Sequence, residues 1–383
     1  MAASQSSQER PGIRFERDAK GRIVRRIIDF GGGGETRSYA YDAKGRLERV
    51  TDGSGALCES YQYDHEGRRL AEINPARFRG ERRYVYAAGN RLSQAGRAQY
   101  RHDAAGYRCL KDEGGRETRY EYEPSGLLLA VELPGGQRIE YAYGAAGQRV
   151  EKRVDGRIAE AYRWRDPLRL LEFFDGREWW RLAYDQQRPG RAPVGVTNGR
   201  ESYLIHSDHL DTPLALANLD GGIVQMMRYD SFGNALGGDH RAVRLPIGFA
   251  GGLYDADTGL TRFVWRDYDA DTGRFTALDP LGAKGGDTDW YGYCVDDPMN
   301  RVDAWGLEWG WKDLADPIQT AAQMAAEKAF TVGKMASRTF GLLTAPLGDL
   351  LFPDPLNDVE QETKEYWDKR NARTEPEDLR DRH

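Results

Sequence analysis

The feature that most constrains the fold is a repeat of about 21 residues in the first half of the chain. In each copy, a Tyr-x-Tyr pair or a close variant is followed by a short polar link and a glycine, and in six of the seven copies a basic residue stands one or two positions after the glycine. Successive repeat glycines lie 17 to 24 residues apart: Gly21, Gly45, Gly67, Gly89, Gly106, Gly126 and Gly147. This repeat predicts one supersecondary unit per copy, with a core that neighbouring units build together.

One copy, "YAYDAKGRLERV", predicts a β-hairpin. Tyr39 and Tyr41 alternate and therefore lie on one face of a strand, "DAKG" supplies a turn, and Leu47 and Val50 follow on a second strand. A lone hairpin is not stable in water, so neighbouring units must pair edge to edge and bury their rings. We expect the basic residues after the glycines to cover the rings or pair with acids on the outer surface. The sequence thus predicts a mainly β protein with a strongly curved antiparallel sheet.

Composition limits the classes of function. The 383 residues, 39% of them apolar and 11% aromatic, are enough for a sizeable core. A net charge of −6 and the absence of a long basic run argue against a nucleic-acid partner. Three scattered cysteines, Cys58, Cys109 and Cys294, indicate free thiols with neither a disulfide framework nor a zinc site. The pattern predicts no metal and no other cofactor.

The repeats resemble those of the Rhs and YD-repeat family of bacterial polymorphic toxins, and the resemblance covers roughly residues 10–307. "HSDHLDTPLALANLDGGIVQMMRYDSFGNAL" is similar to a family segment in which glycine usually stands at the position of Asp211. "GFAGGLYDADTGLTRFVWRDYDADTGRFTALDPLG" resembles the Rhs repeat-associated core. "WYGYCVDDPMNRVDAWGL" resembles the segment that closes this core, with Ala304 in place of a proline.

The resemblance implies a shell. In the family, a YD-repeat sheet spirals into a hollow cocoon around a variable carboxy-terminal effector, and the core plugs one end. We therefore expect a disordered segment at 1–12, YD repeats over 13–200, the core over 201–307 and a variable helical region over 308–383. Family shells are generally much longer than this chain, so we also expect a fragment, an orphan cassette, or a half-shell completed by a partner through an exposed strand edge.

The resemblance also implies a site. The family's core is an aspartyl autoprotease that cuts after the leucine of its closing motif. The residues that match are Arg266 of "RDYDADTGRF", Asp279 of the Asp-Pro pair and Asp303 of "DAWGL", and the bond to be cut joins Leu307 to Glu308.

The residue types suit this chemistry. Two carboxylates in a partly buried site do not both ionise readily, so one can keep a proton while the other activates water. Arg266 can orient a carboxylate or stabilise an oxyanion, or it can merely pair with a turn carboxylate. Proline would hold Asp303 extended, and Ala304 in its place loosens that geometry.

Other polar clusters have structural interpretations. The near-identical "LYDADTG" and "DYDADTG" predict turns capped by their aspartates, with neither the ligand spacing nor the terminal Glu of a calcium loop. His206, Asp208 and His209 resemble a zinc or general-base cluster but have no third remote ligand, and in the family this segment is structural.

The segment 308–383 predicts an amphipathic helix that begins at Asp316 and Pro317 and a second helix from Asn357. Its net charge is −5 and its only histidine is His383, so the sequence names no nuclease or other toxic activity. A toxin, a linker and an effector remnant stay open for this region.

Three functions remain open from the sequence: a toxin-system shell whose core cuts itself once in cis, a non-catalytic β-repeat scaffold or cell-surface carbohydrate-binding module, and a truncated Rhs remnant. The expected partners are the chain's own carboxy-terminal segment as cargo, other shell chains or a secretion-apparatus protein, and an immunity protein; membrane interaction of the helix is weak. The amino terminus has no apolar signal, so we expect synthesis in the cytoplasm and export by a specialised secretion system.

Overall fold

A computed structural model describes residues 12–30, 34–144, 146–185, 190–238, 242–282 and 288–307 of the chain. The predicted mainly β class is confirmed, because a 22-stranded and a 4-stranded sheet account for almost all of the regular structure described. The helices predicted in 308–383 lie outside the described residues. The domain boundaries after residues 12, 200 and 307 remain predictions.

The strands of the large sheet are short and regularly spaced. The first eleven are β1 (Gly12–Arg17), β2 (Ile23–Asp29), β3 (Glu35–Tyr41), β4 (Leu47–Asp52), β5 (Leu57–Tyr63), β6 (Arg69–Ile73), β7 (Glu81–Ala87), β8 (Arg91–Ala95), β9 (Ala98–His102), β10 (Arg108–Asp112) and β11 (Glu117–Tyr122). The next eleven are β12 (Leu128–Glu132), β13 (Arg138–Tyr143), β14 (Arg149–Val154), β15 (Arg157–Asp166), β16 (Arg169–Phe174), β17 (Trp179–Ala183), β18 (Gly195–Thr197), β19 (Ser202–Ser207), β20 (Pro213–Ala217), β21 (Ile223–Tyr229) and β22 (Ala235–Gly238).

The small sheet contains β23 (Leu253–Asp255), β24 (Leu260–Phe263), β25 (Arg266–Asp269) and β26 (Arg274–Phe275). Three single 3-10 turns complete the described structure: η1 (Ala88–Asn90), η2 (Phe249–Gly251) and η4 (Cys294–Asp296). Among the described residues, no helix has the length and apolar character needed to span a membrane.

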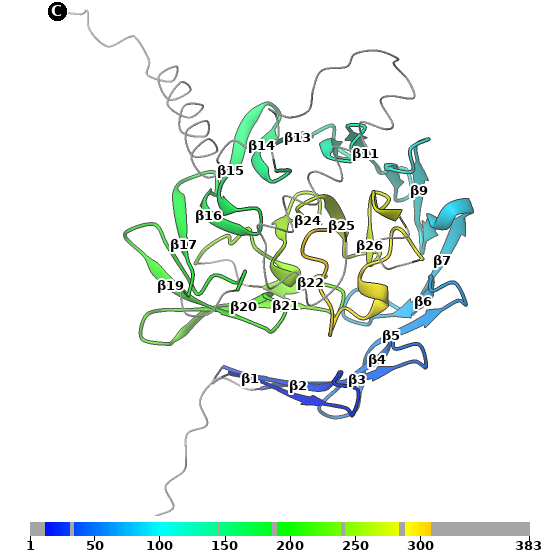
Figure 1. The fold of residues 1–383 in the computed structure, drawn as a ribbon, viewed down its shortest axis with the longest axis horizontal. Coiled ribbons are helices and arrows are strands. Elements are labelled where there is room, and N and C mark those ends of the chain that lie inside the picture. The colour runs from blue at the N-terminus through cyan, green and yellow to red at the C-terminus, as the bar shows by residue number, and fades with distance from the viewer. Residues whose placement is uncertain are drawn as a thin grey trace, which may run out of the picture. The chain divides into compact units, whose positions relative to one another are not determined.

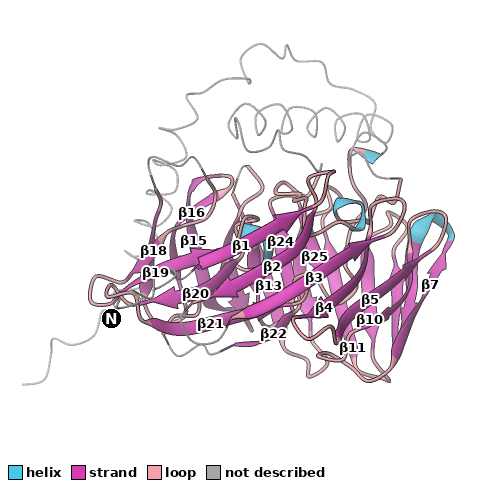
Figure 2. Ribbon diagram, turned by 90° about the horizontal axis from the view of Figure 1, so that it is seen from below, coloured by secondary structure: helices cyan, strands magenta, loops and turns pink. Residues whose placement is uncertain are grey.

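Every strand of the large sheet pairs antiparallel with the strand before it, so the sheet is one long meander. Figure 2 shows β1 to β5 following one another across it. The sheet bends around the small sheet, and β24, β25 and β26 lie inside its curve in Figure 1. The predicted curved antiparallel sheet is therefore confirmed.

A repeat turn is held by the aspartate that follows the second tyrosine. Asp42 Oδ1 accepts hydrogen bonds from the backbone N–H groups of Lys44 (2.9 Å) and Arg46 (3.0 Å), and its Oδ2 accepts one from Arg46 Nε at 2.7 Å. Partial burial raises the pKa of Asp42, but these bonds hold it below its usual value. The Arg46 guanidinium lies 4.5 Å from the centre of the Tyr63 ring, whose hydroxyl donates to the Leu47 carbonyl at 2.8 Å. One repeat is thereby joined to the next.

The repeat glycines adopt the conformation that the sequence predicts. All seven have φ between 72° and 95°, a region that L-residues with a Cβ rarely occupy. Asp211, which stands where the family segment usually has glycine, has φ of 68°. The turn conformation is therefore kept at this position without glycine.

The basic residues two positions after certain glycines point inward, contrary to our expectation. We predicted that they cover the rings or pair with acids on the outer surface, but Arg69, Arg108 and Arg149 are each at most 3% exposed. Their Cα positions begin a new strand whose first side chain faces the small sheet. Arg149 lies 3.6 Å from the centre of the Tyr141 ring, and its Nη2 is 2.9 Å from Asp267 Oδ1. The predicted contacts with rings and acids are confirmed. Only the predicted outer surface was wrong, because strand alternation, not polarity, decides which face a residue occupies.

The two Asp-Ala-Asp turns of the small sheet supply carboxylates that pair with cations of the large sheet. Asp255 and Asp269 cap their own turns as predicted, each accepting the N–H of the residue two positions later. They also reach the large sheet: Lys152 Nζ is 2.6 Å from Asp255 Oδ1, and Arg108 Nη1 is 2.5 Å from Asp269 Oδ2. Asp271 is held by both guanidinium nitrogens of Arg82, at 2.7 and 2.8 Å. The two layers are thus joined through buried ion pairs.

Two turn glycines, one packed against the core and one without near neighbours, should differ in the stability lost when each is replaced by alanine. Gly233 and Gly221 have nearly the same φ, 90° and 88°, but a Cβ at Gly233 would lie 2.8 Å from Phe249 Cβ, whereas one at Gly221 has no atom within 4 Å. The backbone strain is common to both, so Gly233→Ala should destabilise the fold by about 1–3 kcal/mol more than Gly221→Ala. Urea unfolding followed by circular dichroism measures this; equal losses would show that Phe249 does not pack against the turn.

Breaking an ion pair between the layers should lower the free energy of unfolding more than breaking an ion pair on the surface. Arg108→Met leaves Asp269 buried without its cation, so we expect a loss of about 3–5 kcal/mol in the free energy of unfolding. Arg138→Met is the control, because its pair with Glu121, 2.8 Å long, is solvent-exposed, and the substitution should cost less than about 1 kcal/mol. Similar losses in the two urea titrations would contradict the buried arrangement.

Candidate functional site

The structure brings the three predicted catalytic side chains together on one guanidinium. Arg266 opens β25, Asp279 lies in the turn after β26, and Asp303 belongs to the closing motif. Arg266 Nη2 is 2.9 Å from Asp279 Oδ2 and 3.1 Å from Asp303 Oδ2. All three are less than a tenth exposed. The alternative in which Arg266 pairs only with a turn carboxylate does not describe the site, because Arg266 binds the carboxylates of both Asp279 and Asp303.

The two carboxylates are held in the same way. The second oxygen of each accepts a backbone N–H: Asp279 Oδ1 from Leu281 at 2.8 Å, and Asp303 Oδ1 from Leu307 at 2.9 Å. A backbone N–H and the Arg266 guanidinium therefore both orient each carboxylate. For Asp303 the backbone donor is the amide of the residue whose carbonyl would be cut.

The closing motif forms a tight turn against β25. Gly306 N–H donates to the Asp303 carbonyl at 3.3 Å, and the Gly306 carbonyl accepts a bond from Arg266 Nε. Gly306 has φ of 71°, and a Cβ there would lie 3.0 Å from the Phe263 carbonyl oxygen. Ala304 is at the second position of this turn, where proline is favoured, yet the turn forms without it.

Leu307 is enclosed by apolar side chains. It is 1% exposed and belongs to a buried cluster with Val264, Trp265 and Trp305. The backbone N–H of Trp265 also donates to the Trp305 carbonyl at 3.0 Å, which fixes the motif to the turn between β24 and β25. Glu308, the other residue of the predicted cleavage bond, lies outside the described residues.

Two contributors to the site were missed. The backbone carbonyl of Trp290 accepts from Arg266 Nη1 at 3.1 Å and from the Asp279 N–H at 2.8 Å, so it ties together the arginine and one acid. The Phe275 ring centre lies 3.7 Å from the Arg266 guanidinium carbon. The phenylalanine of "RDYDADTGRF" could have suggested the second contact through cation–π geometry, but a backbone carbonyl has no sequence signature.

A cysteine lies near the site without the properties of a nucleophile. Cys294 is 3% exposed, and burial, together with the charge of Asp303, raises the pKa of its thiol well above the ordinary value. The neutral thiol is the weakly reactive form. The three cysteines are free thiols, as predicted.

The other polar cluster is structural. Asp208 Oδ1 caps a turn by accepting the N–H groups of Leu210 and Thr212, and a ring nitrogen of His209 lies 2.8 Å from the Met299 carbonyl oxygen. In the part of the chain that the structure describes, there is no group of three or more His, Cys, Asp or Glu side chains arranged to hold a metal ion.

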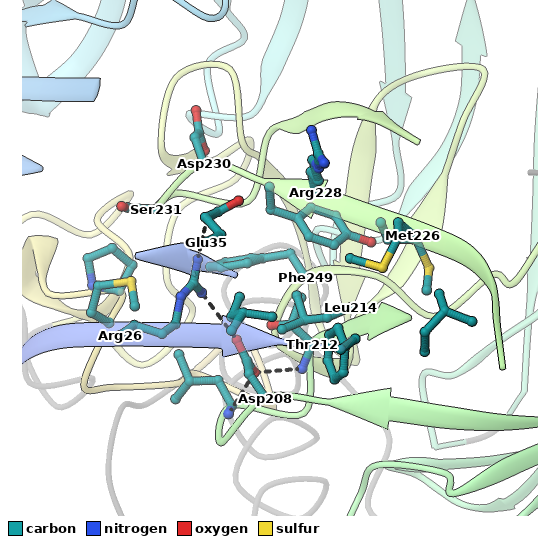
Figure 3. A pocket seen from close by; sticks show the side chains of 18 residues that line it. Arg26, Glu35, Asp208, Thr212, Leu214, Met226, Arg228, Asp230, Ser231 and Phe249 are labelled. Carbon is teal, nitrogen blue, oxygen red and sulfur yellow. Dashed lines mark hydrogen bonds and ion pairs between the residues drawn. The ribbon is translucent and has the colours of Figure 1, made fainter. Parts of the chain in front are cut away.

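A cavity of about 220 Å³ lies apart from this site, where β2 and β3 approach β20 and β21 (Figure 3). Arg26 stands in it between Glu35 and Asp208, at 3.6 and 3.9 Å. None of the three predicted catalytic residues lines this cavity.

Comparison with known proteins identifies the repeats. The family model described as the teneurin YD-shell matches residues 5–284. The chain is 31% identical over 275 residues to Teneurin-3 of Danio rerio and 30% identical over 315 residues to the probable deoxyribonuclease RhsA of Dickeya dadantii (strain 3937). These alignments cover 70% and 71% of this chain. They cover only 10% of the teneurin and 21% of RhsA.

The fold has a counterpart among solved structures. A crystal structure of TcdB2-TccC3-Cdc42 superimposes on 77% of this chain and 17% of that chain, with a TM-score of 0.51 at 16% sequence identity. This likeness bears on the fold alone, while the matched model and the aligned relatives bear on descent. The chain therefore belongs to the teneurin YD-shell family, as a YD-repeat shell protein related to the Rhs proteins.

Proposed function

We propose that this chain is the shell and core protein of a toxin system, that it encloses or presents residues 308–383, and that it cuts itself once after Leu307. The observation that carries the proposal is the burial of the closing motif on Arg266, with Asp279 and Asp303 bound to the same guanidinium nitrogen. A site in which two carboxylates meet beside a buried peptide is the arrangement that acid–base hydrolysis needs.

The proposed reaction is hydrolysis of the Leu307–Glu308 amide. One carboxylate takes a proton from water, whose oxygen forms a bond to the Leu307 carbonyl carbon. The other, protonated carboxyl group gives its proton to the Glu308 nitrogen as the carbon–nitrogen bond breaks. The products are a Leu307 carboxyl group and a free amine on Glu308.

The contacts of Arg266 support a positioning role. Two buried carboxylates facing one guanidinium carry an excess negative charge, and a shared proton relieves that excess. The bond from Arg266 Nε to the Gly306 carbonyl fixes the backbone one residue before the bond to be cut. Arg266 thus holds both acids and the substrate strand in one geometry.

Residues 308–383 are the proposed cargo. RhsA is named as a probable deoxyribonuclease, but this segment has an acidic balance and a single histidine, His383, so we do not assign it that activity. Further proposed partners are other shell chains, a secretion-apparatus protein and an immunity protein. With these partners we propose synthesis in the cytoplasm and export by a specialised secretion system.

A non-catalytic scaffold is the second candidate. The position of Arg266 also supports this candidate, because an arginine between two oriented carboxylates can anchor the end of the core without taking part in a reaction. The two candidates differ in whether the freshly made chain stays whole.

Replacement of either acid should abolish cutting. Intact-mass measurement of the purified wild type should show residues 1–307 and 308–383 as separate species, whereas Asp279→Asn and Asp303→Asn should remain whole because one proton-transfer group is lost. Asp52→Asn, at the end of the remote strand β4, is the control and should be cut. An intact wild type over a range of pH values would refute self-cleavage and favour the scaffold.

Ala304→Pro tests whether the missing proline weakens the site. Proline fits the second position of the Asp303–Gly306 turn and reduces the freedom of the unfolded chain, so we expect a gain of roughly 0.4–1 kcal/mol in stability. Cleavage should persist at the same bond. Thermal unfolding and intact mass measure the two effects; a loss of stability would show that Ala304 has a backbone conformation that proline cannot adopt.

A further inference from the structure

We propose that the folded YD sheet controls the cut: Leu127 and Leu168, from two separate turns of the large sheet, complete the seat of Leu307, so that the chain is cut only after the sheet has closed on the core. This inference rests on the proposed self-cleavage. It assigns positioning roles to residues outside the core.

The seat of Leu307 is built from two layers. The buried cluster around Leu307 consists of Val264, Trp265 and Trp305, all from the core. Leu127, Leu168 and Leu281 pack against this cluster. Leu281 follows Asp279 in the core, but Leu127 lies in the turn between β11 and β12, and Leu168 lies in the turn between β15 and β16. The seat therefore takes two of its apolar contacts from the large sheet.

A third turn presses on the same cluster. Gly147, between β13 and β14, lies so close to the Trp265 ring that a Cβ there would be 2.7 Å from Trp265 Cζ3. Leu168 is in addition fixed within its turn, since its N–H donates to Asp166 Oδ1 at 3.0 Å. Three alternate hairpin turns of the sheet, β11–β12, β13–β14 and β15–β16, therefore contact the seat.

The seat is coupled to the acids through the backbone. The Leu307 N–H is the donor that orients Asp303, at 2.9 Å, and the Trp305 carbonyl is bound by the Trp265 N–H. A displaced Leu307 side chain would therefore shift the amide that holds Asp303 and the carbonyl to be attacked. Small displacements at a reacting centre lower rates steeply. When the sheet has not closed on the core, the reacting groups are misplaced and the chain is not cut. Cleavage therefore occurs only after the shell has assembled.

The experiment follows cutting of the full chain as it is made. The protein is synthesised in a cell-free reaction with a pulse of labelled amino acid, and the conversion to residues 1–307 and 308–383 is timed by gel and mass. Leu127→Ala and Leu168→Ala should each slow the conversion by about 10-fold to 100-fold. Leu127→Met and Leu168→Met keep the volume of the side chain and should restore a rate close to that of the wild type.

Matched controls separate positioning from general loss of stability. Leu129→Ala and Leu171→Ala remove leucines of the same two hairpins that are 39% and 37% exposed, and they should cut at the wild-type rate. Leu92→Ala removes a side chain that is 2% exposed in a cluster of the sheet without core residues, and it should lower stability without slowing the cut to the same degree.

The outcomes distinguish the two proposals. A wild type that is never cut overturns self-cleavage, and this inference with it. A wild type that is cut, with Leu127→Ala and Leu168→Ala cut equally fast, overturns the inference alone. Slowing by Leu92→Ala as large as that by the two seat variants would also overturn it, because the effect would then follow stability rather than position.

Discussion

The structure depends on buried cations of the large sheet that meet carboxylates of the core turns. Arg108 and Lys152 extend from the inner face of the sheet to Asp269 and Asp255. A charge removed from water is costly unless a partner and further hydrogen bonds compensate it, so neither layer is complete without the other. Such pairs add little net stability compared with apolar packing. Their effect is to fix which repeat faces which core turn.

The proposed cleavage site repeats this chemistry at the end of the core. Arg266, like Arg149, lies flat against an aromatic ring and binds a buried carboxylate. Arg149 also lies 3.8 Å from a second carboxylate, that of Asp255. What distinguishes Arg266 is that one of its two carboxylates belongs to the motif that closes the core. Elsewhere in the protein, an arginine that lies over an aromatic ring and binds a buried carboxylate joins the two layers. Here the same arrangement lies beside the peptide that we propose is cut. The proposed reactive site is thus built in the same way as the ion pairs that join the two layers.

The sequence predicts much of this fold because the repeat is local. Tyrosine alternation and the turn glycines specify hairpins from neighbouring residues, and the positive φ of Asp211 follows from its alignment with a glycine position. The inward direction of Arg69 and Arg108 escaped prediction, because a register shift next to the turn decides which face the strand's first residue takes.

The residues of the site were predicted from the family resemblance, but their contacts with one another are known only from the structure. Nothing in the spacing of Arg266 and Asp303, 37 positions apart, reveals that they touch, since their contact depends on how the core folds back on β25. The Trp290 carbonyl could not be foreseen either, because any residue can supply a backbone acceptor.

The most direct test of this account is native-state hydrogen exchange in low concentrations of denaturant. If buried ion pairs make the two layers interdependent, the slowest amides of β25 in the core and of β10 and β14 in the large sheet should exchange with the same free energy of opening. Exchange of the β25 amides at a much lower free energy, with β10 and β14 still protected, would show that the core opens independently and would contradict the account.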